Sequence, residues 1–379
     1  MNRAGEYIKN LSGEAEYRSF RPAALPPAPE LTIGSDMLHK LLRANNGLVR
    51  LETAAGYIPN TELFLSMYVR KEALLTSQIE GTQCTLDDVL DPETDANRNL
   101  DVGDVVNYIR AANFALERMQ SLPLCCRLFK EIHEQLLSGV RGQDKNPGEF
   151  RGSQNWIGPA NCSLKEARYI PPNVEDMEQA MSDLEKYMNY GEDYDPLIRA
   201  ALIHYQFETI HPFLDGNGRI GRLLILLYLL DQKLLSKPIL YISYFLKKNQ
   251  LEYYDRISEV RRTGNYEQWV AFFLEAVSAA AEDALQTIEK LSELHEKNAA
   301  LLPKTRRGKD SVKMLFDHIE QYPILDIKGT AARLELSYNT VSQAVKKLIE
   351  LGVLRETTNA ARNRVFVYED YLAILRKDT

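Results

Sequence analysis

The stretch His211-Pro212-Phe213-Leu214-Asp215-Gly216-Asn217-Gly218-Arg219-Ile220-Gly221-Arg222 decides how this chain of 379 residues is interpreted. It joins two strongly apolar stretches, 195–210 before it and 220–230 after it, and both have the composition of buried helices. The Gly216–Gly218 run permits positive φ, so successive backbone N–H groups can converge on an anion at the start of the second helix. The stretch therefore predicts a helix–loop–helix core with a phosphate-binding loop.

Four side chains in this loop carry chemistry. His211 has an ordinary pKa near neutrality and is suited to act as a general base. Asp215 is a hard oxygen ligand of the kind that Mg²⁺ takes, and Arg219 and Arg222 lie three apart, on one helix face, with forked donors for phosphate oxygens. Each feature alone also fits a common turn, a solvated helix face or a structural histidine. Their combination favours the active site of a nucleotide-using transferase.

The rest of the chain is patterned mainly for helices. Apolar residues recur at helical spacing in most of residues 35–300, whereas the proline-rich residues 1–35 predict an extended arm over the surface of a later domain. We predict helices from about Ser35 and over 61–79, 101–121, 125–138, 174–187, 195–210, 220–230, 240–245, 253–261 and 266–297. Residues 139–172, rich in glycine and proline, predict a loop region with a β-hairpin.

Composition indicates in which cellular compartment the protein works. The chain has a net charge of −7 and four cysteines without a C-x-x-C spacing, which favours reduced thiols in a cytoplasmic protein. The N-terminus lacks the apolar segment of a signal peptide, and the longest apolar run, 223–230, is too short to span a bilayer. We therefore expect no membrane partner.

The loop resembles a known family. Residues 211–222 match, without gaps, the signature H-P-F-x-D-G-N-G-R-x-x-R of the Fic (filamentation-induced-by-cAMP) family. The resemblance implies an all-helical core with a flap hairpin, and transfer of AMP from ATP, with Mg²⁺, to Ser, Thr or Tyr hydroxyls of proteins, including the chain itself. It implies that His211 is the catalytic base and that Asp215 holds the metal. The implied nucleotide-binding residues are Gly216, Asn217, Gly218, Arg219, Ile220, Gly221, Arg222 and, in the adenine pocket, Tyr254.

A second motif resembles the family's inhibitory sequence. Residues 76–81, Thr-Ser-Gln-Ile-Glu-Gly, fit [S/T]-x-x-x-E-[G/N] at the end of the helix expected over 61–79. The resemblance implies that Glu80, with Thr76 and Gly81, pairs with Arg222 and occupies the space of the γ-phosphate. A glutamate before a glycine is also a common helix end, so this reading depends on the first motif.

The C-terminal residues predict a separate module. Helices over 311–322, 327–334 and 337–351, followed by extended runs at 352–357 and 364–368, are typical of a winged helix-turn-helix. Residues 304–379 contain 14 lysines and arginines against 10 aspartates and glutamates, a net +4. The third helix, capped by Ser337, offers Asn and Gln side chains to a DNA groove, and Arg362 and Arg364 fall on the wing. Protein docking by this module remains an equal alternative.

We therefore predict a mainly α chain of three parts. These are an N-terminal arm and inhibitory region (1–100), a catalytic domain (101–300) and a winged-helix module (304–379). The predicted partners are ATP, an unidentified protein substrate, DNA or protein at the module, and a second copy of the chain in a homodimer. The alternatives are transfer of another phosphate-containing group, removal of AMP by Glu80, and a DNA-binding regulator whose Fic domain senses nucleotide.

Overall fold

The core of the protein is built on two buried helices that pack against each other. The computed structural model describes residues 2–56, 61–90, 99–140, 142–159, 162–303, 310–358 and 364–377, and most of them are helical. Helices α7 (Pro196–Ile210) and α8 (Asn217–Asp231) bury nearly all of their side chains. Asp195 caps α7 by accepting a hydrogen bond from the backbone N–H of Leu197, with a proline at the first helical position. The two apolar stretches of the sequence thus form the centre of the fold.

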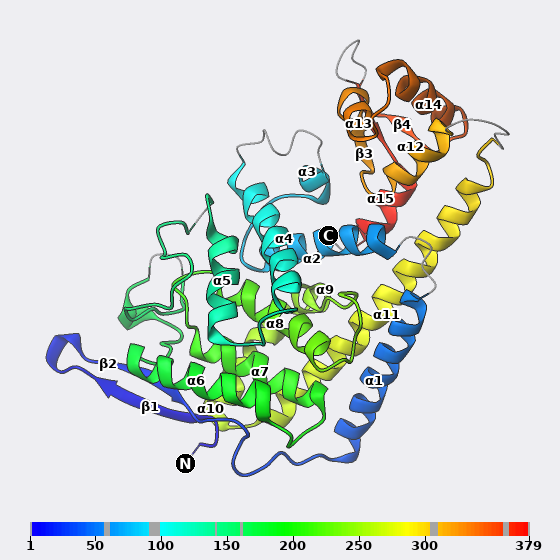
Figure 1. Cartoon of the computed structure of the whole chain (residues 1–379). Coiled ribbons are helices and arrows are strands. Elements are labelled where there is room, and N and C mark those ends of the chain that lie inside the picture. The colour runs from blue at the N-terminus through cyan, green and yellow to red at the C-terminus, as the bar shows by residue number, and fades with distance from the viewer. Residues whose placement is uncertain are drawn as a thin grey trace.

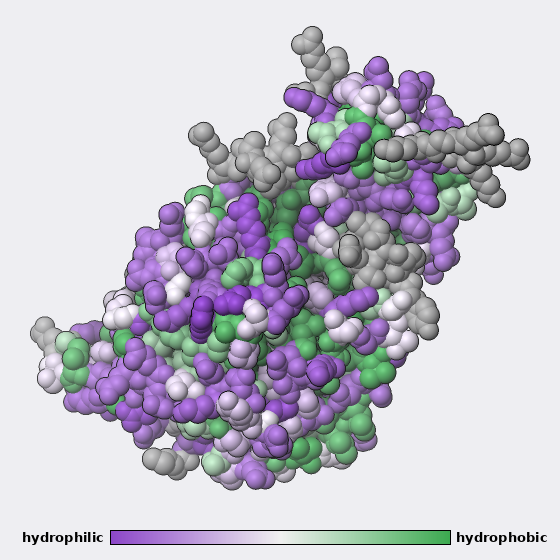
Figure 2. Space-filling view, viewed as in Figure 1, coloured by the Kyte–Doolittle hydropathy of each residue, from purple (hydrophilic) through white to green (hydrophobic). Residues whose placement is uncertain are grey.

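Other helices enclose this pair (Figure 1). Helix α1 packs lengthwise on the long α11, α4 packs on α5, and α6 and α11 both pack on α7. These helices are α1 (Ser35–Ala55), α2 (Thr61–Ile79), α3 (Leu86–Leu90), α4 (Leu100–Arg118), α5 (Cys126–Leu137), α6 (Val174–Tyr190), α9 (Ser243–Lys248), α10 (Gln250–Thr263) and α11 (Tyr266–Ala299). Hydrophilic side chains dominate the face in Figure 2, with apolar residues along α1 that include the exposed Leu38, Leu42 and Val49.

The N-terminal residues form a hairpin rather than a single extended arm. Strands β1 (Gly5–Asn10) and β2 (Tyr17–Pro22) pair antiparallel, with Gly5 opposite Pro22. Proline content in residues 22–29 suggested an unpaired arm, but Pro22 is the last residue of β2 and the other prolines follow it, so none interrupts the strand. The hairpin does lie on the helical core, as expected of the arm, because β2 contacts α6 and α7.

The segment 139–172 contains less pairing than a hairpin. In the described residues of this segment, which omit 141, 160 and 161, one isolated antiparallel bridge joins Ile157 and Tyr169. The backbone N–H of Phe20 in β2 donates to Ile170 O at 3.0 Å, so the N-terminal hairpin continues this short pairing. Part of the hydrogen bonding expected within the segment is therefore made with residues far away in the sequence.

The C-terminal residues form a compact module. It contains α12 (Ser311–Ile319), β3 (Ile324–Asp326), α13 (Ile327–Arg333), α14 (Tyr338–Glu350), β4 (Arg355–Glu356), β5 (Val365–Val367) and α15 (Glu369–Leu375). The antiparallel sheet has the order β3-β5-β4. The expected helices and extended runs are present, and β3 and α15 were not predicted. The predicted boundary at 304 and the predicted wing residue Arg362 fall outside the described residues.

The module lies against the helical core at α11 and α3. Helix α15 packs on α11, and Leu90 of α3 packs against a cluster of Ile324, Val367 and Leu372 (Figure 1). Among the helices of the described residues, none combines the length and the apolar composition needed to cross a membrane.

Candidate functional site

The catalytic loop, which we define as residues 211–222, is shaped by its own backbone. His211 ends α7 in the left-handed conformation (φ 51°, ψ 61°), and Gly216 begins α8 with φ 77°. Asn217 is buried, and its side chain both accepts from the N–H and donates to the carbonyl of Phe213, each at 2.8 Å. Its side chain therefore holds the turn, and its N–H lies in the first turn of α8.

The His211 imidazole is kept neutral. Burial lowers the pKa of His211 to about 4, and the positive charges of Arg151 and Arg261 act in the same direction. Its Nδ1 lies 3.4 Å from Glu208 O at the end of α7. A neutral imidazole at pH 7 can accept a proton, which is the state a general base requires.

Asp215 faces Arg219 across the first turn of α8. Its Oδ1 accepts from Gly216 N at 2.5 Å and lies 3.3 Å from Arg219 Nη2, and its side chain is 42% exposed. A Cβ atom on residue 142 would lie 2.8 Å from Asp215 Oδ2, so the glycine at this position leaves room for the carboxylate. One accessible carboxylate fits Mg²⁺, which usually takes one or two carboxylates together with substrate phosphates. Within the described residues, no cluster of three or more candidate protein ligands competes with this arrangement.

Arg222 is held by the end of helix α2. Its Nε donates to Thr76 Oγ1 at 2.6 Å, and its Nη2 donates to Thr76 O at 3.1 Å and to Glu80 Oε1 at 2.5 Å. Thr76 and Glu80 are four residues apart, and Gly81 follows with φ 95° where the helix has ended. The structure thus brings Arg222 into contact with two residues that lie more than 140 positions before it in the sequence.

The charge of this pair is fixed. Loss of water around Glu80 would raise its pKa, but the Arg222 guanidinium holds the pKa of Glu80 below its usual range. Burial alone would lower the pKa of Arg222, and the Glu80 carboxylate reverses that and holds it above its ordinary value. A Cβ on Gly218 would lie 2.2 Å from Glu80 Oε1, so the glycine allows the carboxylate to reach the start of α8. Glu80 therefore occupies the space in front of the predicted anion nest.

The remaining predicted residues line the same region. Ile220 and Gly221 are buried in α8, and the Gly221 carbonyl lies 2.9 Å from His204 Nδ1. Tyr254 of α10 is 43% exposed; partial burial raises its pKa, and the Glu80 carboxylate adds to this. Its neighbour Tyr253 is buried instead.

Several residues that support the loop were not predicted. Burial lowers the pKa of His133 to about 4, and this neutral ring accepts from Gly148 N at 2.9 Å and lies 3.1 Å from the Asp215 carbonyl. His204 bridges Gly221 and the Tyr253 hydroxyl. Asn155 donates to the carbonyls of His211 and Phe213. The sequence offered only scattered histidines and a polar loop, with no spacing that links them to residues 211–222.

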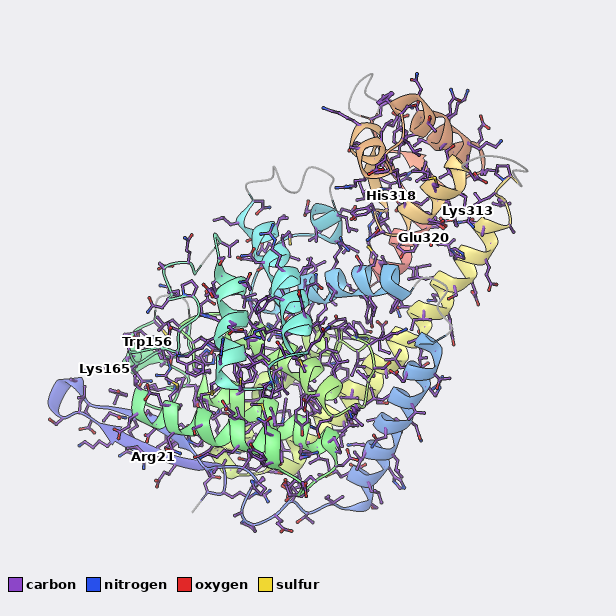
Figure 3. The ribbon with its side chains drawn as sticks, in the orientation of Figure 1. Arg21, Trp156, Lys165, Lys313, His318 and Glu320 are labelled. Atoms are coloured by element: carbon purple, nitrogen blue, oxygen red, sulfur yellow. The ribbon has the colours of Figure 1, made fainter. Side chains whose placement is uncertain are left out.

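The segment 139–172 borders the site with exposed residues. Trp156 is 42% and Ile157 38% exposed, and Figure 3 shows Trp156 and Lys165 together on this segment, away from the helical core. Tyr169 is buried, and its hydroxyl donates to Thr209 O at 2.6 Å near the end of α7. The segment is thus fixed at its base and exposed at its outer edge.

The fold and the loop together define a class of protein, a helical domain in which a histidine precedes the N-terminus of a central helix. Residues 123–229 match the model of the Fic/DOC family, and residues 38–117 match the model of the Fic/DOC family N-terminal region. The chain therefore contains a Fic/DOC domain, preceded by a region that matches the family's N-terminal model.

Relatives agree with this assignment. The chain is 32% identical over 131 residues to the protein adenylyltransferase Fic of Drosophila willistoni, covering 34% of this chain and 23% of that protein. It is 30% identical over 164 residues to the protein of the same name from Culex quinquefasciatus, covering 43% of this chain and 29% of that one. The chain therefore matches less than a third of the length of either relative.

Solved structures share the fold. A Fic family protein from Desulfovibrio desulfuricans G20 superposes with a TM-score of 0.56 at 20% identity, over 89% of this chain and 97% of that chain. A Fic domain containing signaling protein from Bacteroides thetaiotaomicron gives 0.53 at 18% identity, over 67% of this chain and 97% of that chain. The mainly helical fold expected from the sequence is confirmed.

Proposed function

We propose that the chain is a protein adenylyltransferase, which moves AMP from ATP to Ser, Thr or Tyr hydroxyls of proteins, including itself. The observation that carries this is a neutral His211 beside a glycine-lined helix N-terminus with Arg219 and Arg222 on the same helix. The names of the relatives that match the Fic region support the same reaction.

The proposed chemistry assigns each residue a step. His211 takes the proton of the target hydroxyl, the hydroxyl oxygen forms a bond to the α-phosphorus, and the bond to the β-phosphate oxygen breaks as pyrophosphate leaves. The N–H groups of residues 216–218 at the start of α8 and the two arginines hold the phosphate oxygens, and Tyr254 borders the adenine. Asp215 would hold Mg²⁺, which when bound supplies neutralisation of phosphate charge.

We further propose that Glu80 restrains this activity. Its carboxylate bonds Arg222 at 2.5 Å and lies where a phosphate oxygen would meet the start of α8. Thr76 adds two bonds to the same guanidinium and so stabilises the restrained state. ATP bound beside Glu80 would keep its γ-phosphate away from Arg222, and the α-phosphate would be out of line for attack.

The decisive experiment compares labels on ATP in four proteins. Wild type, Glu80→Gly, His211→Ala and Glu335→Gly are incubated with Mg²⁺ and ATP that carries label on either the α- or the γ-phosphate. Glu335 is an exposed glutamate in the C-terminal module with φ 53°, so glycine is tolerated there and the variant is a matched control.

We expect α-label only, raised roughly 100-fold by Glu80→Gly, unchanged by Glu335→Gly and abolished by His211→Ala. Label from the γ-phosphate would replace the proposal with phosphate transfer. Equal incorporation of label in wild type and Glu80→Gly would contradict the proposal that Glu80 restrains the activity. Release of label from a purified AMP-modified protein by wild type but not by Glu80→Gly would favour AMP removal, because the Glu80 side chain is 38% exposed and can reach a water.

A second candidate function concerns the C-terminal module. The exposed side chains of Asn339, Gln343 and Lys346 follow one face of α14, at the spacing of a helix that enters a DNA groove. We propose that residues 304–379 form a winged helix that contacts DNA, beside an inhibitory region in 1–100 and a catalytic domain in 101–300. Binding to duplex DNA whose affinity falls steeply as the salt concentration rises would support this proposal. If the module binds no DNA at low salt, protein docking would be its function instead.

A further inference from the structure

Arg151 is a buried cation whose side-chain bonds all go to main-chain carbonyls in the described part of the chain. It lies within the 139–172 segment and is 1% exposed. Its Nε donates to His211 O (3.0 Å) and its Nη1 to Ser153 O (3.2 Å). Its Nη2 donates to Pro172 O (2.5 Å) and Ile210 O (3.5 Å).

These bonds join two parts of the site. Ser153 lies inside the 139–172 segment and Pro172 is its last residue, whereas Ile210 and His211 end α7. The Arg151 backbone N–H adds a fifth bond, to Pro212 O at 2.9 Å. We infer that Arg151 is a positioning residue, which fixes the His211 main chain, the interior of the 139–172 segment at Ser153 and the end of that segment at Pro172 in one arrangement.

The His211 main chain needs such support. Its left-handed φ of 51° is uncommon for a residue with a side chain, and such conformations persist where the surroundings enforce them. The His211 carbonyl accepts from both Arg151 Nε and Asn155 Nδ2, two donors from the same segment. The direction of the imidazole therefore depends on residues of the segment that would face a protein target. This inference rests on the proposed function only in naming His211 as the base.

A planar fork suits this position better than an amine does. A guanidinium presents its donors in fixed directions to several carbonyls at once, whereas a lysine ammonium is a compact point charge on a flexible stem. Burial lowers the pKa of Arg151 to about 10, so the group is still charged at pH 7. The charge is thus held close to His211 without a neutralising carboxylate among its bonded partners.

That charge gives a readout that packing alone would not change. The groups that act on His211 are the Glu80 carboxylate from α2 and the Glu208 carbonyl of α7, which favour its protonation, and Arg151 and Arg261, which oppose it. The arginines of α8, Arg219 and Arg222, are paired with Asp215 and Glu80. Removal of the Arg151 charge should therefore raise the pKa of His211.

The experiment titrates the His211 imidazole by NMR with ¹³C-labelled histidine, using His211→Ala to assign the signal. Three variants are compared with wild type: Arg151→Gln, which loses charge and fork; Arg151→Lys, which keeps the charge only; and Asn155→Ala, which loses a bond to the same carbonyl and no charge. We expect the pKa of His211 to rise by about 1 unit in Arg151→Gln and to stay unchanged in the other two. An unchanged pKa in folded Arg151→Gln overturns the inference.

Kinetics separate the fork from the charge. With Glu80→Gly in all proteins, Arg151→Lys should lower kcat about tenfold and shift KM for the protein target, while KM for ATP stays constant, because the misplaced groups are the base and the target-facing segment. Full kcat in Arg151→Lys would overturn the positioning role. If Glu80→Gly itself transfers no AMP, the proposed function fails, whereas the NMR titration still decides whether Arg151 sets the state of His211.

Discussion

The catalytic loop and helix α14 use polar side chains in opposite ways. In the loop, Asn217 and Arg222 are buried and bonded to other groups of the protein. In α14, Asn339, Gln343 and Lys346 are exposed, and the buried residues are Val341, Ala344, Val345 and Leu348. The same kinds of side chain are thus part of the fold in one region and displayed to solvent in the other.

The difference has energetic consequences. A buried polar group that loses its partner costs the free energy of its lost solvation, whereas an exposed one exchanges its partner for water. Substitutions in the catalytic loop should therefore affect stability and chemistry together. Substitutions in α14 should affect only what the module binds.

The largest expected effect tests this contrast with one chemical change at two positions. Asn217→Ala leaves the N–H of Phe213 without its side-chain partner and its carbonyl with Asn155 alone, and we expect it to lower the free energy of unfolding by about 2 kcal/mol. Asn339→Ala removes the same amide from an exposed position and should change it by less than about 0.5 kcal/mol. Urea unfolding of both variants gives the measurement. Equal losses would show that the two regions do not differ as their burial indicates.

The next effect concerns how Arg222 is held. Thr76→Ala removes the hydroxyl that accepts from Arg222 Nε but leaves the Glu80 pair, so we expect AMP transfer to rise about tenfold, less than in Glu80→Gly. Ser77→Ala is the matched control, because the neighbouring buried hydroxyl makes no hydrogen bond in the described residues. Incorporation of α-label measures both. A Thr76→Ala protein as inactive as Ser77→Ala would mean that Glu80 alone holds the arginine.

The local pattern of the sequence predicted the elements that carry the chemistry. Apolar periodicity and the glycine at position 81 predicted the helix over 61–79, and the composition around 211–222 predicted a loop between two buried helices. These features depend on residues within one or two turns of each other. Local rules of helix formation and termination therefore suffice to predict them.

The supporting residues depend on contacts that local rules do not describe. Arg151 reaches His211 from 60 positions away, and His133 reaches Asp215 from 82. Strand β2 pairs with β1, and its Phe20 also bonds Ile170. Neither pairing could be deduced from the proline-rich N-terminal residues alone. Helix α15 has only seven residues, too few to display a helical period. What the sequence missed is the tertiary pairing of segments, together with short elements such as β3 and α15.

A smaller effect is expected at α14, where binding rather than stability should change. If the module binds duplex DNA, Lys346→Gln should weaken binding a few-fold for all sequences and reduce the salt slope by about 1, because one phosphate contact is lost. Lys290→Gln, a substitution of an exposed lysine on α11, is the control for net charge. Fluorescence anisotropy over a range of salt concentrations separates the two. Equal losses of DNA affinity in both variants would indicate that DNA is attracted by the charge of the whole chain, and would contradict the assignment of DNA binding to α14.

The smallest expected effect lies where the C-terminal module, which contains α14, meets the helical core, which contains the catalytic loop. Arg376, just after α15, donates from Nε and Nη2 to the two oxygens of Asp87 in α3, at 2.8 and 2.7 Å. The side chains are 30% and 47% exposed, so the pair is screened by water, and Arg376→Gln should cost about 1 kcal/mol or less. Arg262→Gln, which breaks an exposed pair within α10, is the control. Because Leu90 of α3 also packs on the module, a single cooperative transition should persist in thermal unfolding of Arg376→Gln. Two separate transitions would mean that the charged pair, rather than the apolar contact, couples the module to α3.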